Sequence, residues 1–289
     1  MSDAAPICIA VLAHNEAARI ATCLKSLPLN NTEVAIHVVV NGSTDATASI
    51  AADIASTASN VRVHVFKEGG KARSWNRFLF DQLSAFHATH VFVDGDAEIV
   101  PGSIAALEAT LKAQPGANAA AGLPMNGRKM AHYQQAMRAE HGLFGDLYAL
   151  RGDFLSRMKA ANIRLPDDVI GDDGLICAMA KTDLADESQW RDQRVAICEG
   201  AGFLCAPVRL LSPASWQMQY RRMINDSVRH FQNAMISRIM RDSGPKNLPR
   251  QMANLYRREL PSMRPRAKLE LLWFDRIALR KMARAVAPV

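Results

Sequence analysis

Along the first hundred residues, continuous apolar runs alternate with segments in which apolar residues recur every three or four positions. Residues 7–13 form an uninterrupted apolar run (ICIAVLA), the pattern of a strand buried on both faces. Residues 16–27 place Ile20, Leu24 and Leu27 at helical spacing. The alternation continues, and we expect strands at 34–40, 61–66 and 90–93 and helices at 44–56 and 71–87. It predicts parallel strands joined by helical crossovers, and hence an α/β fold with helices on both faces of an open sheet.

The pattern becomes less regular beyond Pro101. We expect a helix at residues 103–113 and a strand at 118–123. An irregular stretch punctuated by glycines follows from residue 124 to residue 152. Loops of this kind often carry substrate specificity, so we expect this stretch to contribute to recognition of a substrate.

The C-terminal part is predicted to be helical and strongly basic. Trp216, Tyr220 and Ile224 fall on one helical face, and we place a domain boundary near Pro207, between an α/β domain (1–206) and a helical subdomain (207–289). The whole chain has a net charge of +7. Residues 207–289 contain 17 Lys and Arg against 5 Asp and Glu, a charge of +12, whereas residues 1–206 contain 18 against 23, a charge of −5.

This charge distribution suits an anionic membrane surface or another polyanion. Because the α/β part is acidic and only 6% of the residues are aromatic, we expect no nucleic-acid partner. Near the end of the chain, Leu269, Trp273, Arg280 and Arg284 belong to an amphipathic basic helix that could lie on a bilayer. Docking of the same helix on the body through its apolar stripe is an equal alternative.

The five cysteines, at positions 8, 23, 177, 198 and 205, are odd in number and form no C-x-x-C pair. This spacing argues against a zinc site and against a disulfide framework. Charged residues interrupt every apolar stretch before it reaches the length of a membrane-spanning helix. We therefore expect a cytoplasmic protein, with peripheral attachment to the inner face of the membrane as an option.

Polar residues follow the predicted strands at the carboxyl ends, where open α/β sheets bind ligands. The tripeptide Asp94-Gly95-Asp96 places two carboxylates around a glycine. Carboxylate oxygens suit Mg²⁺ or Mn²⁺, and glycine lets the backbone approach a ligand closely. Alone, this tripeptide is often only a turn. In Asn41-Gly42-Ser43-Thr44-Asp45, Ser43 or Thr44 can cap the next helix.

Two further segments are candidates for chemistry. Lys71 and Asn76 follow a pair of glycines, which is a weak phosphate signal. Residues 166–174 contain four carboxylates, and paired acids raise each other's pKa, which is useful for a general base. An acidic helix N-terminus favoured by the helix dipole is the alternative interpretation.

Taken in order, these segments resemble the family-two glycosyltransferases of the GT-A fold, inverting enzymes that use nucleotide-diphosphate sugars. The similarity runs over residues 6–225. The motifs that carry it are the first strand with Asn15-Glu16, the turn Asn41–Asp45 (D-G-S-T-D in the family), Gly70-Lys71 with Asn76 (G-K-x-x-x-x-N), Asp94-Gly95-Asp96 (D-x-D), Gly171-Asp172-Asp173 (E-D) and Gln219–Met223 (Q-x-x-R-W).

The resemblance implies a Rossmann-like, mixed and mostly parallel sheet flanked by helices. It implies that Asp96, supported by Asp94, holds Mg²⁺ or Mn²⁺ on the donor diphosphate, and that Asp173, next to Asp172, is the catalytic base. The donor-binding residues that it implies are Ala13, Asn15, Glu16, Asn41, Gly42, Lys71, Asn76, Asp94, Gly95, Asp96 and Arg222.

The chain departs from the family pattern at two places. Val40 and Asn41 stand where the family has an acid that contacts the nucleoside, so a UDP-sugar is only the default donor. Met223 replaces the Trp of the last motif, and no transmembrane segment accompanies it. We therefore expect transfer of one sugar to a hydroxyl acceptor, which could be lipid-linked or a polysaccharide or glycolipid precursor, rather than processive synthesis.

Two other functions stay open. A sugar nucleotidyltransferase has a related sheet, but the chain lacks the glycine-rich, arginine-containing signature expected near its first strand. A non-catalytic scaffold that binds nucleotide sugars is suggested by Val40 and Met223, whereas the presence of Asp94, Asp96 and Asp173 argues against it.

Overall fold

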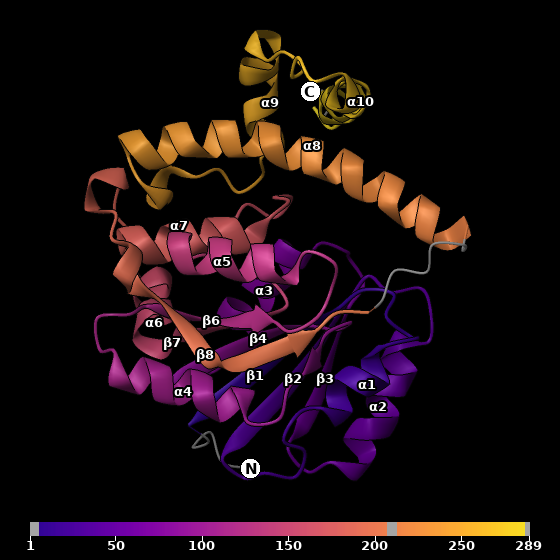
Figure 1. The fold of residues 1–289 in the computed structure, drawn as a ribbon, viewed down its shortest axis with the longest axis vertical. Helices are drawn as coiled ribbons and strands as arrows, with labels where there is room; N and C mark the ends of the chain where they lie inside the picture. Colours follow the sequence, from indigo (N-terminus) through magenta and orange to yellow (C-terminus); the bar gives the residue numbers. More distant parts are fainter. Residues whose placement is uncertain (1–5, 207–212, 287–289) are drawn as a thin grey trace.

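The computed structural model describes residues 6–206 and 213–286, and Figure 1 shows their arrangement. One sheet of eight strands has the order β3-β2-β1-β4-β7-β6-β8-β5. Neighbouring strands are parallel except where β7 pairs with β4 and β6 and where β5 pairs with β8. The strands are β1 (Ile7–Ala13), β2 (Val34–Asn41), β3 (Val61–Phe66), β4 (Thr89–Asp94), β5 (Glu98–Ile99), β6 (Ala119–Pro124), β7 (Leu147–Arg151) and β8 (Val195–Leu204).

Helices cover both faces of this sheet, as the alternating pattern predicts. They are α1 (Ile20–Lys25), α2 (Thr47–Thr57), α3 (Lys71–Arg77), α4 (Ser103–Ala113), α5 (Met130–Glu140), α6 (Gly152–Ala160), α7 (Asp172–Thr182), α8 (Pro213–Asp242), α9 (Ala253–Glu259) and α10 (Leu269–Arg284). A π-helical turn, Phe78–Gln82, continues α3, and short 3₁₀ turns cover Glu187–Gln189, Asp192–Arg194, Pro245–Asn247 and Leu260–Ser262. The expected mixed, mostly parallel sheet is confirmed.

Alternate side chains of β1 enter two hydrophobic clusters, one on each face of the sheet. Ile9 and Val11 pack with residues of α1, α2 and α4, whereas Ala10 and Leu12 belong to a cluster with residues of α3, α6, α7 and the C-terminal helices. All seven residues of β1 are buried. This explains why β1 is an unbroken apolar run rather than an alternating one.

Several predicted boundaries need correction. The first two helices begin later than expected, at Ile20 and Thr47, and the helix predicted to reach residue 87 ends at Gln82. The stretch 124–152 is not irregular, because it contains α5 and β7. Only Met137 of α5 is buried, so this helix has almost no apolar stripe for a pattern to reveal.

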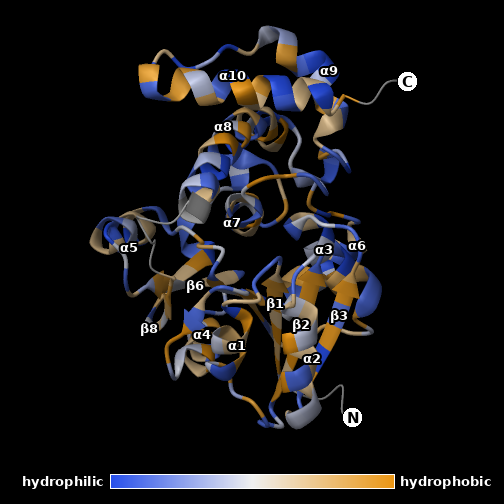
Figure 2. Ribbon diagram, turned by 90° about the vertical axis from the view of Figure 1, so that its right-hand side faces the viewer, coloured by the Kyte–Doolittle hydropathy of each residue, from blue (hydrophilic) through white to orange (hydrophobic). Residues whose placement is uncertain are grey.

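The C-terminal helices pack on the α/β part. Phe231 and Met235 of α8, Tyr256 of α9 and Met282 of α10 belong to the same cluster as Leu12 of β1. Figure 2 shows α8 over the sheet and α10 across α8, at the end of the molecule away from the N-terminus. The division at residues 206 and 207, which we predict from composition, adjoins residues outside the described part of the chain.

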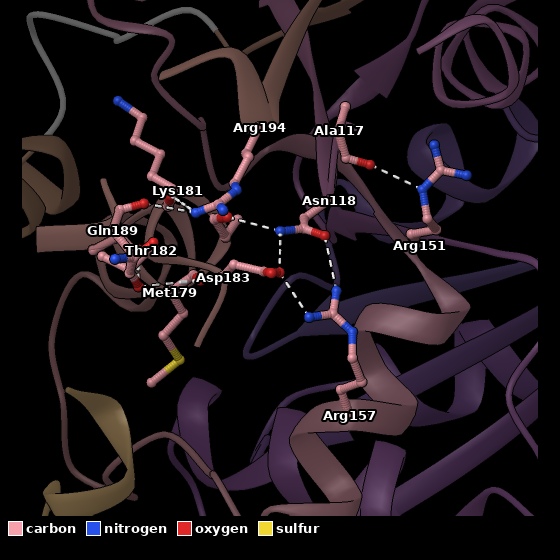
Figure 3. Close-up of polar contacts among 12 residues, drawn as sticks. Ala117, Asn118, Arg151, Arg157, Met179, Lys181, Thr182, Asp183, Gln189 and Arg194 are labelled. Carbon is pink, nitrogen blue, oxygen red and sulfur yellow. Dashed lines mark hydrogen bonds and ion pairs between the residues drawn. The ribbon is translucent and has the colours of Figure 1, made fainter. Parts of the chain in front are cut away.

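A polar network around the buried Asn118 holds the far end of α7 (Figure 3). Asn118, next to β6, donates hydrogen bonds to the Ala180 carbonyl and to Asp183 Oδ1, both at 2.9 Å. Arg157 of α6 donates to Asp183 Oδ1 at 2.6 Å and to Asn118 Oδ1 at 3.0 Å. These contacts tie α7 to α6 and β6, and the start of α7 carries the predicted catalytic acids.

All five cysteines are free thiols. Within the described residues, no helix combines the length and the low charge needed to cross a bilayer.

We predict that Asp275→Asn destabilises the protein by about 3 kcal/mol, because Asp275 is fully buried and forms a 2.6 Å ion pair with Arg266. Burial acts to raise the pKa of Asp275, but Arg266 lowers it to about 2. The folded-state pKa thus lies below the unfolded value of about 3.9, so this stabilisation should be complete above that pH and disappear as the pH falls toward 2.

Urea unfolding of the wild type and of Asp275→Asn, at several pH values between neutral and acidic, measures the loss of stability. The control is Asp226→Asn, which removes an exposed i,i+3 ion pair with Arg229 and should change stability by less than about 1 kcal/mol. If Asp275→Asn and Asp226→Asn lowered stability equally, the stabilising role of the Asp275–Arg266 ion pair would be contradicted.

Candidate functional site

A cavity of about 550 Å³ opens at the carboxyl ends of β1, β2 and β4. Its walls come from the ends of these strands and from the start of α3. The lining residues are Leu12, His14, Glu16, Asn41, Gly69, Gly70, Lys71, Asp94, Gly95 and Asp96. The structure thus brings together six of the residues predicted for the donor site, namely Glu16, Asn41, Lys71, Asp94, Gly95 and Asp96.

The floor of the cavity depends on a close approach between β1 and the turn after β4. A Cβ atom on Gly95 would lie 2.8 Å from Ala13 Cβ, and the Gly95 amide donates to the Leu12 carbonyl at 2.9 Å. Ala13 is fully buried and does not line the cavity. Its side chain packs against Gly95, and its predicted part in donor binding stays a prediction.

The turn after β2 is held by side chains as well as by backbone. Asn41 is 4% exposed, donates from Nδ2 to the Ala13 carbonyl at 3.0 Å and accepts the Gly70 amide at 3.3 Å. Gly42 has φ +60°, and a Cβ there would come within 2.6 Å of the Gly69 backbone. Asn41 and Gly42 thus join β1, β2 and the loop before α3 at the cavity wall.

Asn15 and Asp45 complete this turn. Asn15 accepts the Thr44 amide at 2.8 Å and donates its own backbone amide to Ser43 Oγ at 3.0 Å. The prediction that Ser43 or Thr44 caps the next helix is wrong, because α2 begins later, at Thr47, and no side chain caps it. Asp45 instead accepts the Thr47 amide at 3.0 Å and the Ala17 amide at 3.1 Å. These hydrogen bonds therefore hold the loop after β1 against the loop after β2.

Three carboxylates could hold a metal ion at one side of the cavity. Ligand oxygens of Asp94, Asp96 and Asp146 lie within 4.8 Å of one another. Hard oxygen ligands in this number suit Mg²⁺ or Mn²⁺, with the remaining positions left for water or phosphate oxygens.

Sequence reasoning missed Asp146, which lies in the stretch 124–152 that we treated as irregular. Its backbone carbonyl accepts the Asp94 amide at 3.3 Å, because β7 pairs with β4 immediately afterwards. An isolated Gly-Asp before a short apolar run carries no local signal, so only the pairing of β7 with β4 reveals its place.

Lys71 connects the carboxylates after β4 with those at the start of α7. Lys71 Nζ lies 2.6 Å from Asp94 Oδ1 and 3.9 Å from Asp172 Oδ2. Asp172 is 6% exposed, whereas its neighbour Asp173 is half-buried. A Cβ on Gly145 would lie 3.0 Å from Lys71 Nζ, 3.6 Å from Asp94 Oδ2 and 3.7 Å from Asp173 Oδ2, so these three groups converge on one point.

Burial and like charges raise the pKa values of several of these acids. Burial raises the pKa of Asp94 to about 8 despite the opposing charge of Lys71, and burial followed by the charge of Asp96 raises that of Asp146 to about 6. Glu16 reaches about 7, mainly through burial and then through Asp96. Burial acts to lower the pKa of Lys71, but the charges of Asp172 and Asp94 hold this pKa well above its ordinary value. The site contains more negative charge than one lysine offsets.

The loop that leads into Asp172 is fixed from two sides. Asn76 donates to the Leu165 carbonyl at 2.8 Å and to Asp167 Oδ1 at 3.1 Å, and accepts the Leu165 amide at 3.1 Å. Asn76 is 3% exposed and does not line the cavity. These hydrogen bonds give Asn76 a positioning role for the loop, and its predicted contact with the donor stays a prediction.

Helix α8 fixes the other side of this loop. Gln232 accepts the Ile170 amide at 2.8 Å and donates to the Asp168 carbonyl at 3.0 Å. Asp168 in turn accepts the Ala253 amide at 3.1 Å, and the side chain of Arg229 fills the space beside Gly171. The C-terminal helices therefore position the predicted catalytic acids.

Arg222 of α8 is exposed and does not line the cavity. Its charge opposes the increase in pKa that burial and Asp146 cause at Cys205.

The sequence pattern described as Glycosyl transferase family 2 matches residues 8–187, which is more than half of the chain. The chain belongs to glycosyl transferase family 2. No curated protein sequence matches it significantly.

Solved structures similar to this family 2 glycosyltransferase share its GT-A fold. The mannosyltransferase PcManGT from Pyrobaculum calidifontis, in complex with GDP-Man and Mn²⁺, is 21% identical, with a TM-score of 0.61 over 98% of this chain and 76% of that one. S. aureus TarS 1–349 with UDP-GlcNAc is 16% identical, with a TM-score of 0.52 over 97% and 81%. Glucosyl-3-phosphoglycerate synthase from Mycobacterium tuberculosis, with Mn²⁺, UDP and glucosyl-3-phosphoglycerate, is 20% identical, with a TM-score of 0.51 over 77% and 80%.

For this glycosyltransferase we predict that Gly42→Ala lowers stability by about 2 kcal/mol, because it combines a left-handed backbone with an overlap on Gly69. The control is Gly116→Ala, whose Cβ would meet open space and which should change stability by less than about 0.5 kcal/mol. Urea unfolding measures both, and a neutral Gly42→Ala would show that the turn tolerates a side chain.

Proposed function

We propose that this family 2 glycosyltransferase moves one hexose, with inversion at the anomeric carbon, from a nucleotide-diphosphate sugar to a hydroxyl acceptor. The observation that supports this most directly is the convergence of Asp173, Asp94 and Lys71 on one point beside the cluster of Asp94, Asp96 and Asp146. A donor diphosphate at the metal cluster would present its sugar toward Asp173.

The carboxylate cluster fits a divalent cation, Mg²⁺ or Mn²⁺. Three oxygen ligands within 4.8 Å, in a site with excess negative charge, are a suitable donor set for such an ion. When bound there, the ion would offset the negative charge that develops on the departing nucleoside diphosphate. PcManGT and glucosyl-3-phosphoglycerate synthase were both solved with Mn²⁺, which agrees with this choice.

In the proposed reaction the Asp173 carboxylate accepts the proton of the acceptor hydroxyl. The acceptor oxygen forms a bond to the anomeric carbon as the bond from that carbon to the phosphate oxygen breaks on the opposite face. The electron pair leaves with the nucleoside diphosphate. Lys71 forms an ion pair with Asp94 at 2.6 Å and keeps the Asp94 carboxylate in place. Asp172 remains buried beside Lys71.

We predict that Asp173→Asn lowers kcat by roughly 10²- to 10⁴-fold, because the amide cannot take the acceptor proton. Binding of the nucleotide, followed by calorimetry, should be unchanged. The matched control is Asp153→Asn, an exposed acid on α6, which should leave kcat unaltered. Near wild-type turnover by Asp173→Asn would remove Asp173 as the base.

We predict that Mn²⁺ raises the Tm of the protein and that Asp96→Asn and Asp146→Asn each abolish most of this increase, because each removes one of three ligands. Asp53→Asn, an exposed acid on α2, should retain the full increase. A thermal-shift series with Mn²⁺, Mg²⁺ and EDTA measures it. If Asp146→Asn responded to Mn²⁺ like the wild type, Asp146 would not be a ligand.

The nucleotide is the least specified part of the donor. Asn41 stands where the family has an acid, and its amide is already bonded to Ala13 and Gly70. We propose a UDP-sugar as the default donor, and a thermal-shift comparison of UDP, GDP, CDP and dTDP with Mn²⁺ tests it. If none stabilised the protein, a non-catalytic scaffold would become the better interpretation.

We propose that the acceptor hydroxyl belongs to a lipid-linked, glycolipid or polysaccharide precursor. The stretch 124–152 supplies Gly145 and Asp146 to the site, so its loops, together with α8, are placed to contact an acceptor.

A further inference from the structure

A second cavity lies far from the sheet, between α8 and α10. Figures 1 and 2 show that α10 crosses α8 at the outer end of the molecule. The angle between the two helices contains a groove of about 680 Å³, which we call the basic groove. Its lining residues are Tyr220, Arg221, Ile224, Asn225, Ile277, Arg280, Lys281 and Arg284.

The basic groove is a concentration of uncompensated positive charge. Four of its eight lining residues are Arg or Lys, and none is acidic. Lys281 donates to Asn225 Oδ1 at 3.2 Å, whereas Arg221, Arg280 and Arg284 form no ion pair with any residue in the described ranges. Cations held this close to one another repel, so an anionic ligand is favoured there.

Large apolar side chains extend from both walls of the groove into solvent. On α10, Leu269 and Trp273 precede Ile277 at intervals of four residues and are 88% and 62% exposed. On α8, Trp216 precedes Tyr220 and Ile224 at the same interval and is 70% exposed. Because residues four apart share a helix face, both apolar stripes run into the basic groove.

The other faces of α8 and α10 pack against the rest of the protein. On α10, Asp275 pairs with Arg266, and Ala278 and Met282 are buried. On α8, Phe231 and Met235 enter the core cluster. The ring of Tyr220 contacts that of Phe274 on α10 and so helps to join the two helices. The exposed Leu269 and Trp273 are additional to the residues that dock α10, which favours binding to a surface over simple packing of the helix on the body.

We propose that the basic groove and its flanking side chains bind the surface of an anionic phospholipid bilayer. Arg221, Arg280 and Arg284 would contact lipid phosphates, while Trp216, Leu269 and Trp273 enter the interfacial layer. Tryptophan favours that layer, and each Lys or Arg near an anionic surface adds to binding. A nucleic acid would use the cations but leave exposed leucine and tryptophan unburied.

The basic groove and the active site share helix α8. On α8, Arg221 lines the basic groove, and Gln232 of the same helix accepts the Ile170 amide and so holds the loop that leads into Asp172. One helix thus contributes to both, and attachment of the groove to a bilayer would hold the active site at the membrane surface, where a lipid-linked acceptor would be found.

Vesicle co-sedimentation of the full chain tests the proposal without any donor or acceptor, so its outcome is independent of the transferase reaction. We expect binding to phosphatidylcholine vesicles that contain about one-third phosphatidylglycerol, and much weaker binding to pure phosphatidylcholine. Binding should fall as salt rises above about 0.1 M, and tryptophan fluorescence should shift to shorter wavelength on binding.

Arg280→Gln/Arg284→Gln should lower the vesicle partition coefficient roughly 30-fold, because two charges near the surface are lost. The matched control, Lys246→Gln/Arg257→Gln, removes the same charge from exposed positions outside the groove and should lower it less than about threefold. Trp273→Ala leaves the charge unchanged and should also weaken binding, with circular dichroism confirming that each variant is folded.

Three results would overturn the proposal. The wild type could fail to bind anionic vesicles even at low salt. The two double variants could lose binding equally, which would indicate a general effect of net charge. Retention on heparin without binding to vesicles would assign the groove to a soluble polyanion instead.

Discussion

Five aspartates converge at one edge of a parallel sheet, and the fold has to hold them together against their mutual repulsion. Asp94, Asp96 and Asp146 lie close enough to share an ion, and Asp172 and Asp173 begin a helix immediately beside them. Burial increases this cost because it removes the screening effect of water. Within residues 6–206 and 213–286, Lys71 is the one cation that forms ion pairs with them, with Nζ at 2.6 Å from Asp94 and 3.9 Å from Asp172. The surrounding packing therefore has to be rigid.

That rigidity comes from elements far apart in the sequence. The approach of Gly95 to Ala13 fixes Asp94 and Asp96 over the end of β1, and the pairing of β7 with β4 brings Asp146 to them. The start of α7 is held by Asn76 on one side and by Gln232 of α8 on the other. The helices after residue 212 are thus part of the machinery that positions the acids, whatever else they do.

The same helices have a second, outward-facing surface with a different chemistry. The inner face of α8 contributes Phe231 and Gln232 to the body, whereas Arg221 and Tyr220 border the basic groove. The charge asymmetry of the chain, −5 in residues 1–206 and +12 beyond, has a structural counterpart in this arrangement. Acidic side chains gather where a cation and a nucleotide would bind, and basic side chains gather in the groove between α8 and α10.

The order of strands and helices up to residue 123, the family and most of the cavity wall follow from the sequence, because they depend on local periodicity and on short motifs that follow strands. Glu16, Asn41, Lys71, Asp94 and Asp96 come together as those motifs predict. Only the tertiary structure shows where Asp146 lies, that Ala13 and Asn76 are buried, and that Gln232 forms hydrogen bonds with the loop before α7. Each of these depends on contacts between residues distant in the chain, such as Asn76 with Asp167, that leave no periodic or local trace in the sequence.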